Sequence, residues 1–246
     1  HRAVLRNHRE ERPLRGRHVG AWQRIVSVGY NLSVYFMTGH RALDRLMRCT
    51  MLLPIVVLGA CSWMPRQGDL VFQVAGGSDM SQAIVDTTTN VDSLQFDHVA
   101  VFAGSRRNPF VVEASPEKGV VRTPWREFLN RSGGGVVVKR LDADYPKQEA
   151  VERALAHLGQ PYDWYYLPDN GRTYCSELVE ESYLYADSTR IFPAKPMRFR
   201  AADGTMPRFW TDLFHRLGAS VPEGVPGTNP NDMSRFRLLH TVRVFR

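Results

Sequence analysis

The sequence predicts an α+β fold in which a small antiparallel β-sheet packs against helices within one domain. Short segments with strand-like alternation of apolar and polar residues follow one another closely between residues 98 and 141, with Gly, Asn and Pro turn residues between them. Longer segments with helical periodicity follow in the second half of the chain. The chain has 246 residues, of which 43% are apolar, and it contains no internal repeat and no Pro- or Ser-rich linker. These features favour one globular domain with its own core.

The first half of this domain is expected to contain most of the sheet. Apolar residues at 70, 72 and 74 alternate as in a half-buried strand over 69–74, and Ser78 or Asp79 can cap a helix that extends to about residue 89. Thr123–Pro124 is expected to begin a short helix that reaches about residue 130. The antiparallel strands are expected over 98–103, 110–114, 119–122 and 136–141.

The second half is expected to supply longer helices. Tyr145–Pro146 opens a helix whose apolar residues fall at positions i, i+3, i+4 and i+7, and Gly159 ends it. Another helix is expected to begin at Tyr174 or Cys175 and to reach about residue 186. A further helix over 207–217, a turn-rich tail over 221–234 and a final strand over 238–245 complete the expected elements.

The charge of the chain is distributed unevenly. The net charge is +7, and residues 1–60 alone contain ten arginines and three acidic residues. Residues 61–246 therefore contain equal numbers of basic and acidic side chains, so this part carries no basic excess that would favour a nucleic-acid partner.

The segment before residue 61 has the pattern of a bacterial lipoprotein signal peptide. An apolar run over 51–60 follows three arginines. This run of about ten residues is too short to cross a bilayer, which takes roughly 20. The junction Leu58–Gly59–Ala60–Cys61 resembles a lipobox, so Cys61 is expected to become a lipidated N-terminus that holds the protein at the membrane. In the alternative, the run is a buried element of the domain and Cys61 is an ordinary core thiol.

These patterns divide the chain into three parts. Met37 lies 24 residues before Cys61, which gives a signal peptide over 37–60. Residues 1–36 are then expected to be a non-native or disordered upstream segment, and residues 61–246 form the functional domain. A lipid on Cys61 places the domain in the cell envelope, at the periplasmic face and on the outer membrane of an organism that has one.

Three residues of the domain have the residue types and spacing of a thiol-dependent active site. Cys175 lies at the expected start of a helix, where the helix dipole and a paired imidazole favour the thiolate. His98 begins one expected strand and can act as the base, and Glu113 on the next strand can orient the imidazole. The 15 positions between His98 and Glu113 allow a strand, a turn and an antiparallel return, which would make the two side chains neighbours.

Six short motifs occur along the chain in a specific order. They are Gly68–Phe72 (GDLVF), Ser81–Ile84 (SQAI), Asp97–Val101 (DHVAV), Val112–Ala114 (VEA), Gly159–Asp163 (GQPYD) and Tyr174–Val179 (YCSELV). This ordered set resembles the YiiX/YebB group of permuted papain-like cysteine hydrolases in the NlpC-type superfamily. The resemblance covers roughly residues 68–186, and the order His98, Glu113, Cys175 is the one that the circularly permuted branch requires.

The resemblance implies a circularly permuted papain-like fold, with a small antiparallel sheet or partly open barrel packed against helices. It also implies acyl transfer through a thioester on Cys175, without a cofactor or a metal. Tyr174, Asp69 and Asp163 are expected to line the substrate cleft.

Three functions follow from these expectations. The first is cleavage of an amide bond, with a peptidoglycan stem peptide as substrate and the Cys175–His98–Glu113 triad as catalyst. The second is a non-catalytic envelope lipoprotein that binds a peptide or lipid in the same cleft. The third keeps the triad but acts on lipid acyl groups, as a hydrolase or transferase.

Overall fold

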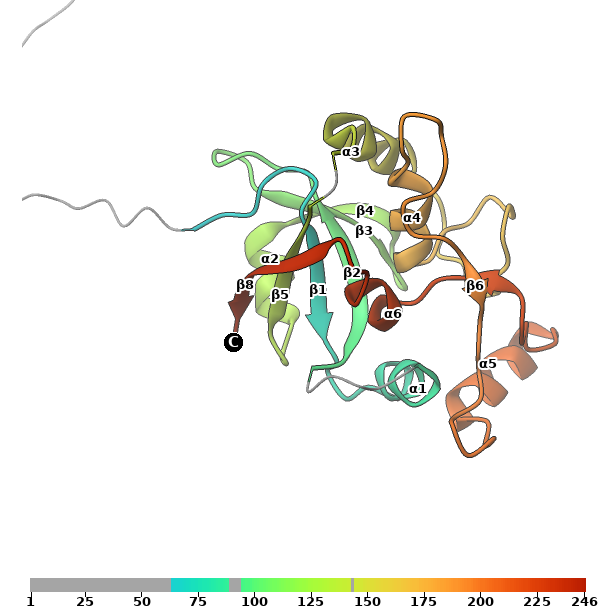
Figure 1. The fold of residues 1–246 in the computed structure, drawn as a ribbon. Coiled ribbons are helices and arrows are strands. Elements are labelled where there is room, and N and C mark those ends of the chain that lie inside the picture. Colours follow the sequence, from blue (N-terminus) through green and yellow to red (C-terminus); the bar gives the residue numbers. More distant parts are fainter. Residues whose placement is uncertain (1–62, 89–93, 143) are drawn as a thin grey trace, which may run out of the picture. The chain divides into compact units, whose positions relative to one another are not determined.

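The computed structural model describes residues 63–88, 94–142 and 144–246. These residues form a six-stranded sheet, a two-stranded ribbon and six helices (Figure 1). The strands are β1 (Leu70–Val74), β2 (Phe96–Phe102), β3 (Phe110–Ser115), β4 (Gly119–Pro124), β5 (Val136–Leu141), β6 (Lys195–Pro196), β7 (Pro226–Gly227) and β8 (Leu239–Phe245). The helices are α1 (Asp79–Thr87), α2 (Trp125–Arg131), α3 (Lys147–Ala156), α4 (Cys175–Ser182), α5 (Arg208–Leu217) and α6 (Pro230–Ser234). The segment 1–36, the expected signal peptide and Cys61 lie outside the described residues.

The main sheet confirms the predicted α+β fold. Its strand order is β4-β3-β2-β1-β5-β8, and each neighbouring pair is antiparallel. The strands β2, β3 and β4 follow one another as an antiparallel meander. Strand β5, which the sequence placed in the same succession of strands, does not continue it but pairs with β1 and β8. None of the helices in the described ranges is long and apolar enough to span a membrane.

Each face of the sheet has its own apolar cluster, because successive side chains of a strand point to opposite faces. Leu70, Phe72, Val99 and Val101 belong to the larger cluster, together with residues of α1, α3, α4 and α5. On the other face, Val71, Ala100 and Phe102 pack with Trp125 and Phe128 of α2. Figure 1 accordingly shows α2 and α4 on opposite sides of the sheet.

Two parts of the chain differ from the expected elements. The helix α4 ends at Ser182 rather than near residue 186, because Leu184 instead forms an isolated bridge with Arg190. In the tail, α6 and the short ribbon of β6 and β7 were not expected. Helix α6 is only five residues long, and it begins at a side-chain cap in which Asn229 accepts the backbone N–H of Asp232. Strands of two residues have no alternation that a sequence pattern could reveal.

Strand β3 pairs with its two neighbours over different lengths, and this difference determines where the site lies. β3 pairs with β4 over six residues, but with β2 only through Val111 and Val112. The part of β2 that contains His98 pairs with β1 but does not pair with β3. Helix α4 contacts both strands. The sheet is thus partly open between β2 and β3, next to the helix that begins with Cys175.

Candidate active site

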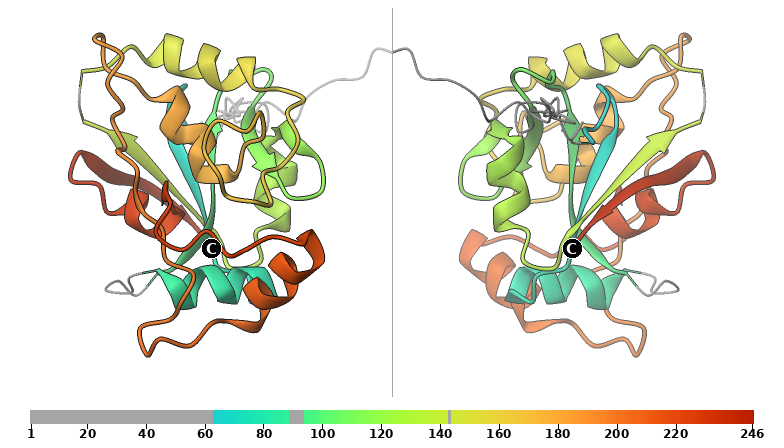
Figure 2. Two further views of the ribbon diagram at one scale, coloured as in Figure 1. Left: turned by 90° about the vertical axis from the view of Figure 1, so that its right-hand side faces the viewer. Right: turned by 90° about the vertical axis from the view of Figure 1, so that its left-hand side faces the viewer.

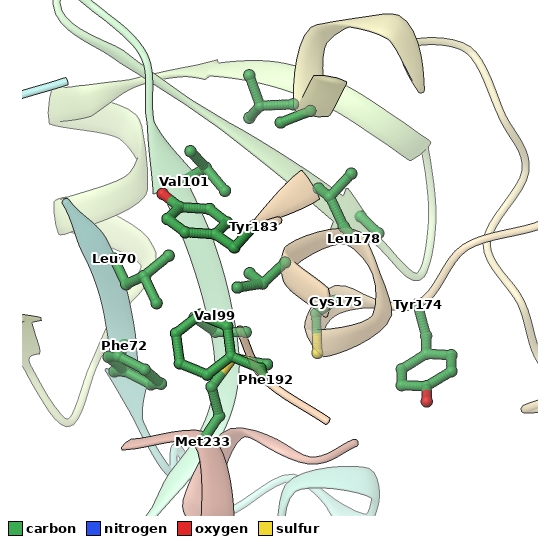
Figure 3. Close-up of a cluster of buried hydrophobic side chains, with 14 of the residues drawn as sticks. Leu70, Phe72, Val99, Val101, Tyr174, Cys175, Leu178, Tyr183, Phe192 and Met233 are labelled. Atoms are coloured by element: carbon green, nitrogen blue, oxygen red, sulfur yellow. The ribbon is translucent and has the colours of Figure 1, made fainter. Parts of the chain in front are cut away.

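Cys175 is the first residue of α4, at the amino end of a helix. The preceding residue, Tyr174, has an extended backbone, and its N–H donates to Glu177 Oε2 at 3.3 Å. This contact uses one of the donors that the first turn of a helix leaves without a partner. The Cys175 side chain is buried, and Figure 3 shows it on the first turn of α4 with the ring of Tyr174 beside it.

His98 and Glu113 form a close pair across the partly open region of the sheet. His98 Nε2 lies 2.6 Å from Glu113 Oε2, and Glu113 is fully buried. This contact leaves Nδ1 as the ring nitrogen that can face the thiol of Cys175. The imidazole also interacts with the Cys175 side chain. The structure therefore brings together the three residues that the sequence singled out.

Two further side chains complete the surroundings of Glu113. The Thr123 hydroxyl on β4 donates to Glu113 Oε1, and the Arg131 guanidinium at the end of α2 donates to Oε2. Neither residue is among the site residues that the sequence predicts. Thr123 could have been found from the register of β3 and β4, which pairs it with Val111 on the same face as Glu113. Arg131 could not have been found, because its position depends on how α2 packs against the sheet.

These contacts set the charges of the pair. Burial by itself lowers the pKa of His98, but the contacts with Cys175 and Glu113 outweigh it and raise the pKa from 6.5 to about 10. Burial by itself raises the pKa of Glu113, but the hydrogen bonds and charges of His98 and Arg131 lower it to about 2. At neutral pH, His98 is therefore an imidazolium and Glu113 is a carboxylate.

A cavity of about 190 Å³ adjoins Cys175. Its wall comes from the start of α4, from α1, α5 and α6, and from the segments around β6 and β7. Aromatic and aliphatic side chains predominate, among them Ile84, Tyr162, Tyr166, Phe192, Met197, Phe199, Trp210, Met233 and Phe236. Polar groups at the wall include Ser176, Thr228 and Lys195. This composition suits an apolar group bound next to the thiol.

Tyr174 is the one of the three expected substrate-contact residues that lines this cavity. Its hydroxyl accepts the backbone N–H of Thr228 at 3.0 Å and lies 3.8 Å from Met197 Sδ. These contacts connect the first turn of α4 to the segments around β6 and β7.

Asp69 and Asp163 are not among the described residues that line this cavity. Asp69 is buried and accepts two hydrogen bonds of 2.7 Å from the guanidinium of Arg140. Asp163 is buried and accepts the backbone N–H groups of Tyr165 and Leu167, at 2.9 and 2.8 Å. Both carboxylates hold local structure, as short acidic side chains do in turns and ion pairs.

Comparison with known proteins assigns the family. Residues 64–243 match the family described as permuted papain-like amidase enzyme, YaeF/YiiX, C92 family. The chain belongs to this family. It is therefore a cysteine hydrolase of the amidase type, as the ordered motifs implied.

Two relatives agree with this assignment. The chain is 28% identical over 180 residues to YiiX of Escherichia coli strain K12, described as an uncharacterized protein, and the match covers 71% of this chain and 84% of YiiX. It is also similar to a crystal structure described as the metalloprotein yiiX of E. coli O157:H7. That similarity has a TM-score of 0.60 and 26% identity, and it covers 74% of this chain and 98% of the other.

Proposed function

We propose that the chain cleaves an amide through a thioester on Cys175, with His98 as acid and base and Glu113 as its orienting partner. The observation that carries this proposal is the contact of one imidazole with both the Cys175 side chain and the carboxylate of Glu113. A carboxylate on one ring nitrogen fixes the orientation of the other nitrogen toward the thiol.

The reaction follows from these positions. The thiolate of Cys175 attacks the carbonyl carbon, and the carbonyl oxygen becomes an oxyanion next to the backbone N–H of Cys175 at the helix start. The C–N bond then breaks as the imidazolium of His98 gives its proton to the leaving amine, which leaves a thioester on Cys175. In the second half, His98 takes a proton from water and the resulting hydroxide attacks the thioester carbonyl. The C–S bond then breaks, which releases the free acid and restores the Cys175 thiolate beside the His98 imidazolium.

The cavity favours a substrate with an apolar acyl group. An aliphatic or aromatic group that enters it loses its contact with water, and each buried CH₂ contributes about 0.8 kcal/mol. A charged stem peptide gains little from walls made of residues such as Phe199 and Trp210. Of the substrate classes that the sequence left open, an amide or ester of an apolar acyl group therefore fits the cavity better, and the peptidoglycan peptide is the second candidate.

A metal is not used in this mechanism. The relative with a crystal structure is described as a metalloprotein. In the part of this chain that the structure describes, no group of three or more His, Cys, Asp and Glu side chains is arranged to hold a metal ion. The steps above are written with the side chains and the backbone of the chain itself and with water.

The location of the enzyme in the cell envelope is also a proposal. It depends on lipidation of Cys61, for which the lipobox-like junction is the support. A membrane anchor would bring the cavity close to acylated lipids and lipoproteins. Mass spectrometry of the protein purified from a membrane fraction tests this, because a diacylglyceryl group on Cys61 gives a defined mass increase.

Replacement of Cys175 tests the catalytic proposal. The probes are p-nitroanilides of acetic and octanoic acid and a muropeptide, each with the wild type and with Cys175→Ser. We expect turnover of the octanoyl amide to exceed that of the acetyl amide, and the variant to lose at least about 10³-fold, because a serine beside this histidine is a much weaker nucleophile. Turnover of the muropeptide alone would favour the second candidate. Equal turnover by the wild type and the variant would overturn the proposal.

The non-catalytic alternative is separated by thiol reactivity. If Cys175 and His98 form an activated pair, iodoacetamide alkylates Cys175 at a pH well below the pH that an ordinary thiol requires. His98→Ala then moves alkylation back to that higher pH. A thiol that reacts as an ordinary cysteine with and without His98 would favour a binding protein.

A further inference from the structure

Arg131 contacts the same carboxylate oxygen as His98. Its guanidinium and His98 Nε2 both meet Glu113 Oε2, and Thr123 donates to the other oxygen, Oε1. Glu113 is fully buried, whereas the Arg131 side chain is 36% exposed. Arg131 therefore extends from the surface, at the end of α2, to a carboxylate in the interior.

The charges of the site require a group of this kind. When the site is ready for attack, Cys175 is a thiolate, His98 an imidazolium and Glu113 a carboxylate, so these three buried groups carry a net charge of −1. A buried net charge is costly unless a partner compensates it. The cationic guanidinium of Arg131 brings the sum to zero.

The position of Arg131 is fixed by packing as well as by charge. Its guanidinium lies over the ring of Phe128, 4.8 Å from the ring centroid. Phe128 is fully buried, and its ring centroid is 6.0 Å from that of the His98 imidazole. One turn of α2 thus contacts the imidazole through Phe128 and the carboxylate through Arg131.

We propose that Arg131 is a positioning residue that acts through Glu113, and that its charge sets the pH at which Cys175 becomes reactive. The inference rests on the proposed function, because it assigns Arg131 to the same Cys175–His98–Glu113 site. Arg131 does not touch the reacting atoms. It keeps Glu113 ionised and compensates its charge, so that the carboxylate can hold an imidazolium next to a thiolate.

The test follows the alkylation of Cys175 by iodoacetamide as a function of pH. It uses the full chain, and peptide mass spectrometry separates Cys175 from the other two cysteines. In Arg131→Gln we expect the pH of half-maximal alkylation rate to rise by about one unit, because a lost opposite charge at this range disfavours the charged state of the site. Arg131→Lys should restore part of the difference, since it keeps the charge but not the planar fork.

Two controls make the result specific. Arg126→Gln removes an exposed arginine of the same helix and should leave the pH profile of the wild type unchanged. Arg131→Met removes the charge but can still pack on Phe128, so it should shift the profile as Arg131→Gln does. If circular dichroism shows that Arg131→Gln does not fold, Arg131→Met tests the inference in its place.

A double mutant shows whether Arg131 acts through Glu113. In the Glu113→Gln background the carboxylate that Arg131 compensates is gone, so adding Arg131→Gln should produce little further shift. A wild-type profile in both Arg131→Gln and Arg131→Met, or a full additional shift in the Glu113→Gln background, would overturn the inference.

The alkylation assay needs no substrate, so its outcome is independent of the proposed reaction. An unchanged profile in the Arg131 variants, together with an inactive Cys175→Ser, overturns only the role of Arg131. An active Cys175→Ser overturns the proposed function.

Discussion

On one side of Cys175, polar side chains converge on the buried carboxylate of Glu113, whereas on the other side a cavity is lined mainly by aromatic and aliphatic side chains. The polar side consists of His98, Glu113, Thr123 and Arg131, and both carboxylate oxygens of Glu113 accept hydrogen bonds. The cavity side is formed by segments from six helices and strands, and within the described ranges the buried Ser176 hydroxyl and Trp210 Nε1 of its wall have no hydrogen-bond partner.

The difference shows two ways in which a fold can serve one nucleophile. The polar side depends on individual hydrogen-bond donors, because a buried carboxylate that loses one of them keeps a charge that no partner compensates. Binding on the cavity side depends on the volume and shape of the cavity, to which several neighbouring side chains contribute together. Substitutions on the polar side should therefore change the chemical step, and substitutions on the cavity side should change the choice of substrate.

Glu113→Gln should have the largest effect, because it removes the charge that holds His98 as an imidazolium. We expect kcat for the octanoyl amide to fall by about 10²-fold or more, while KM changes little. Glu152→Gln is the control, since Glu152 is an exposed residue of α3 that accepts a hydrogen bond from Gln148 rather than from the site. A Glu113→Gln enzyme with the kcat of the wild type would remove the distinction between the two sides.

Gly227→Ala should have a smaller effect, confined to the cavity side. A Cβ at this position would lie 2.4 Å from Met197 Sδ and 2.7 Å from the Tyr174 hydroxyl, so both side chains would have to move within the cavity wall. We expect KM for the octanoyl amide to rise by roughly tenfold, about 1.4 kcal/mol of lost binding, with an unchanged rate of Cys175 alkylation.

Gly76→Ala is the control for this substitution, because a Cβ there meets no atom within 4 Å. If Gly227→Ala altered the alkylation rate but not KM, the cavity would be part of the reactive side rather than of the binding side.

Glu177→Gln should have the smallest effect, on stability alone. Glu177 is also a buried carboxylate, but burial raises its pKa to about 8, whereas the cationic partners of Glu113 lower the pKa of that residue. Between its unfolded pKa of 4.5 and about 8, the folded protein keeps a proton that the unfolded chain releases, so stability falls as the pH rises.

The window from pH 5 to 6 emphasises this effect, because it lies above the unfolded pKa of Glu113 and below the unfolded pKa of 6.5 of His98. Across it, we expect the free energy of unfolding in urea to fall by about 1 kcal/mol in the wild type and to fall less in Glu177→Gln, where Glu180, whose pKa burial also raises, still contributes. Glu149→Gln, an exposed residue of α3, should behave as the wild type. The same slope in Glu177→Gln and in the wild type would mean that the two carboxylates do not differ as described.

Local patterns predicted most of the fold. Alternation and turn residues located the strands from β1 to β5 within a few residues, and helical periodicity located α3 and α5. The patterns failed where an element is too short for its period to repeat, as in β6 and β7 with two residues each and α6 with five. They also predicted too long a helix for α4. A bridge between Leu184 and Arg190 replaces its expected last turn, and no periodic pattern in the sequence relates these two residues.

The sequence by itself predicted the cysteine, the histidine and the glutamate that the structure brings together, because a cysteine at a helix start and two polar residues on adjacent strands are local features with a specific order. It also determined the family. Only the tertiary structure decided what surrounds them. Asp69 and Asp163 have structural partners in the fold, and Arg131 reaches Glu113 because α2 packs across the sheet. Charge compensation and cavity shape arise from contacts between distant segments, and no single segment encodes them.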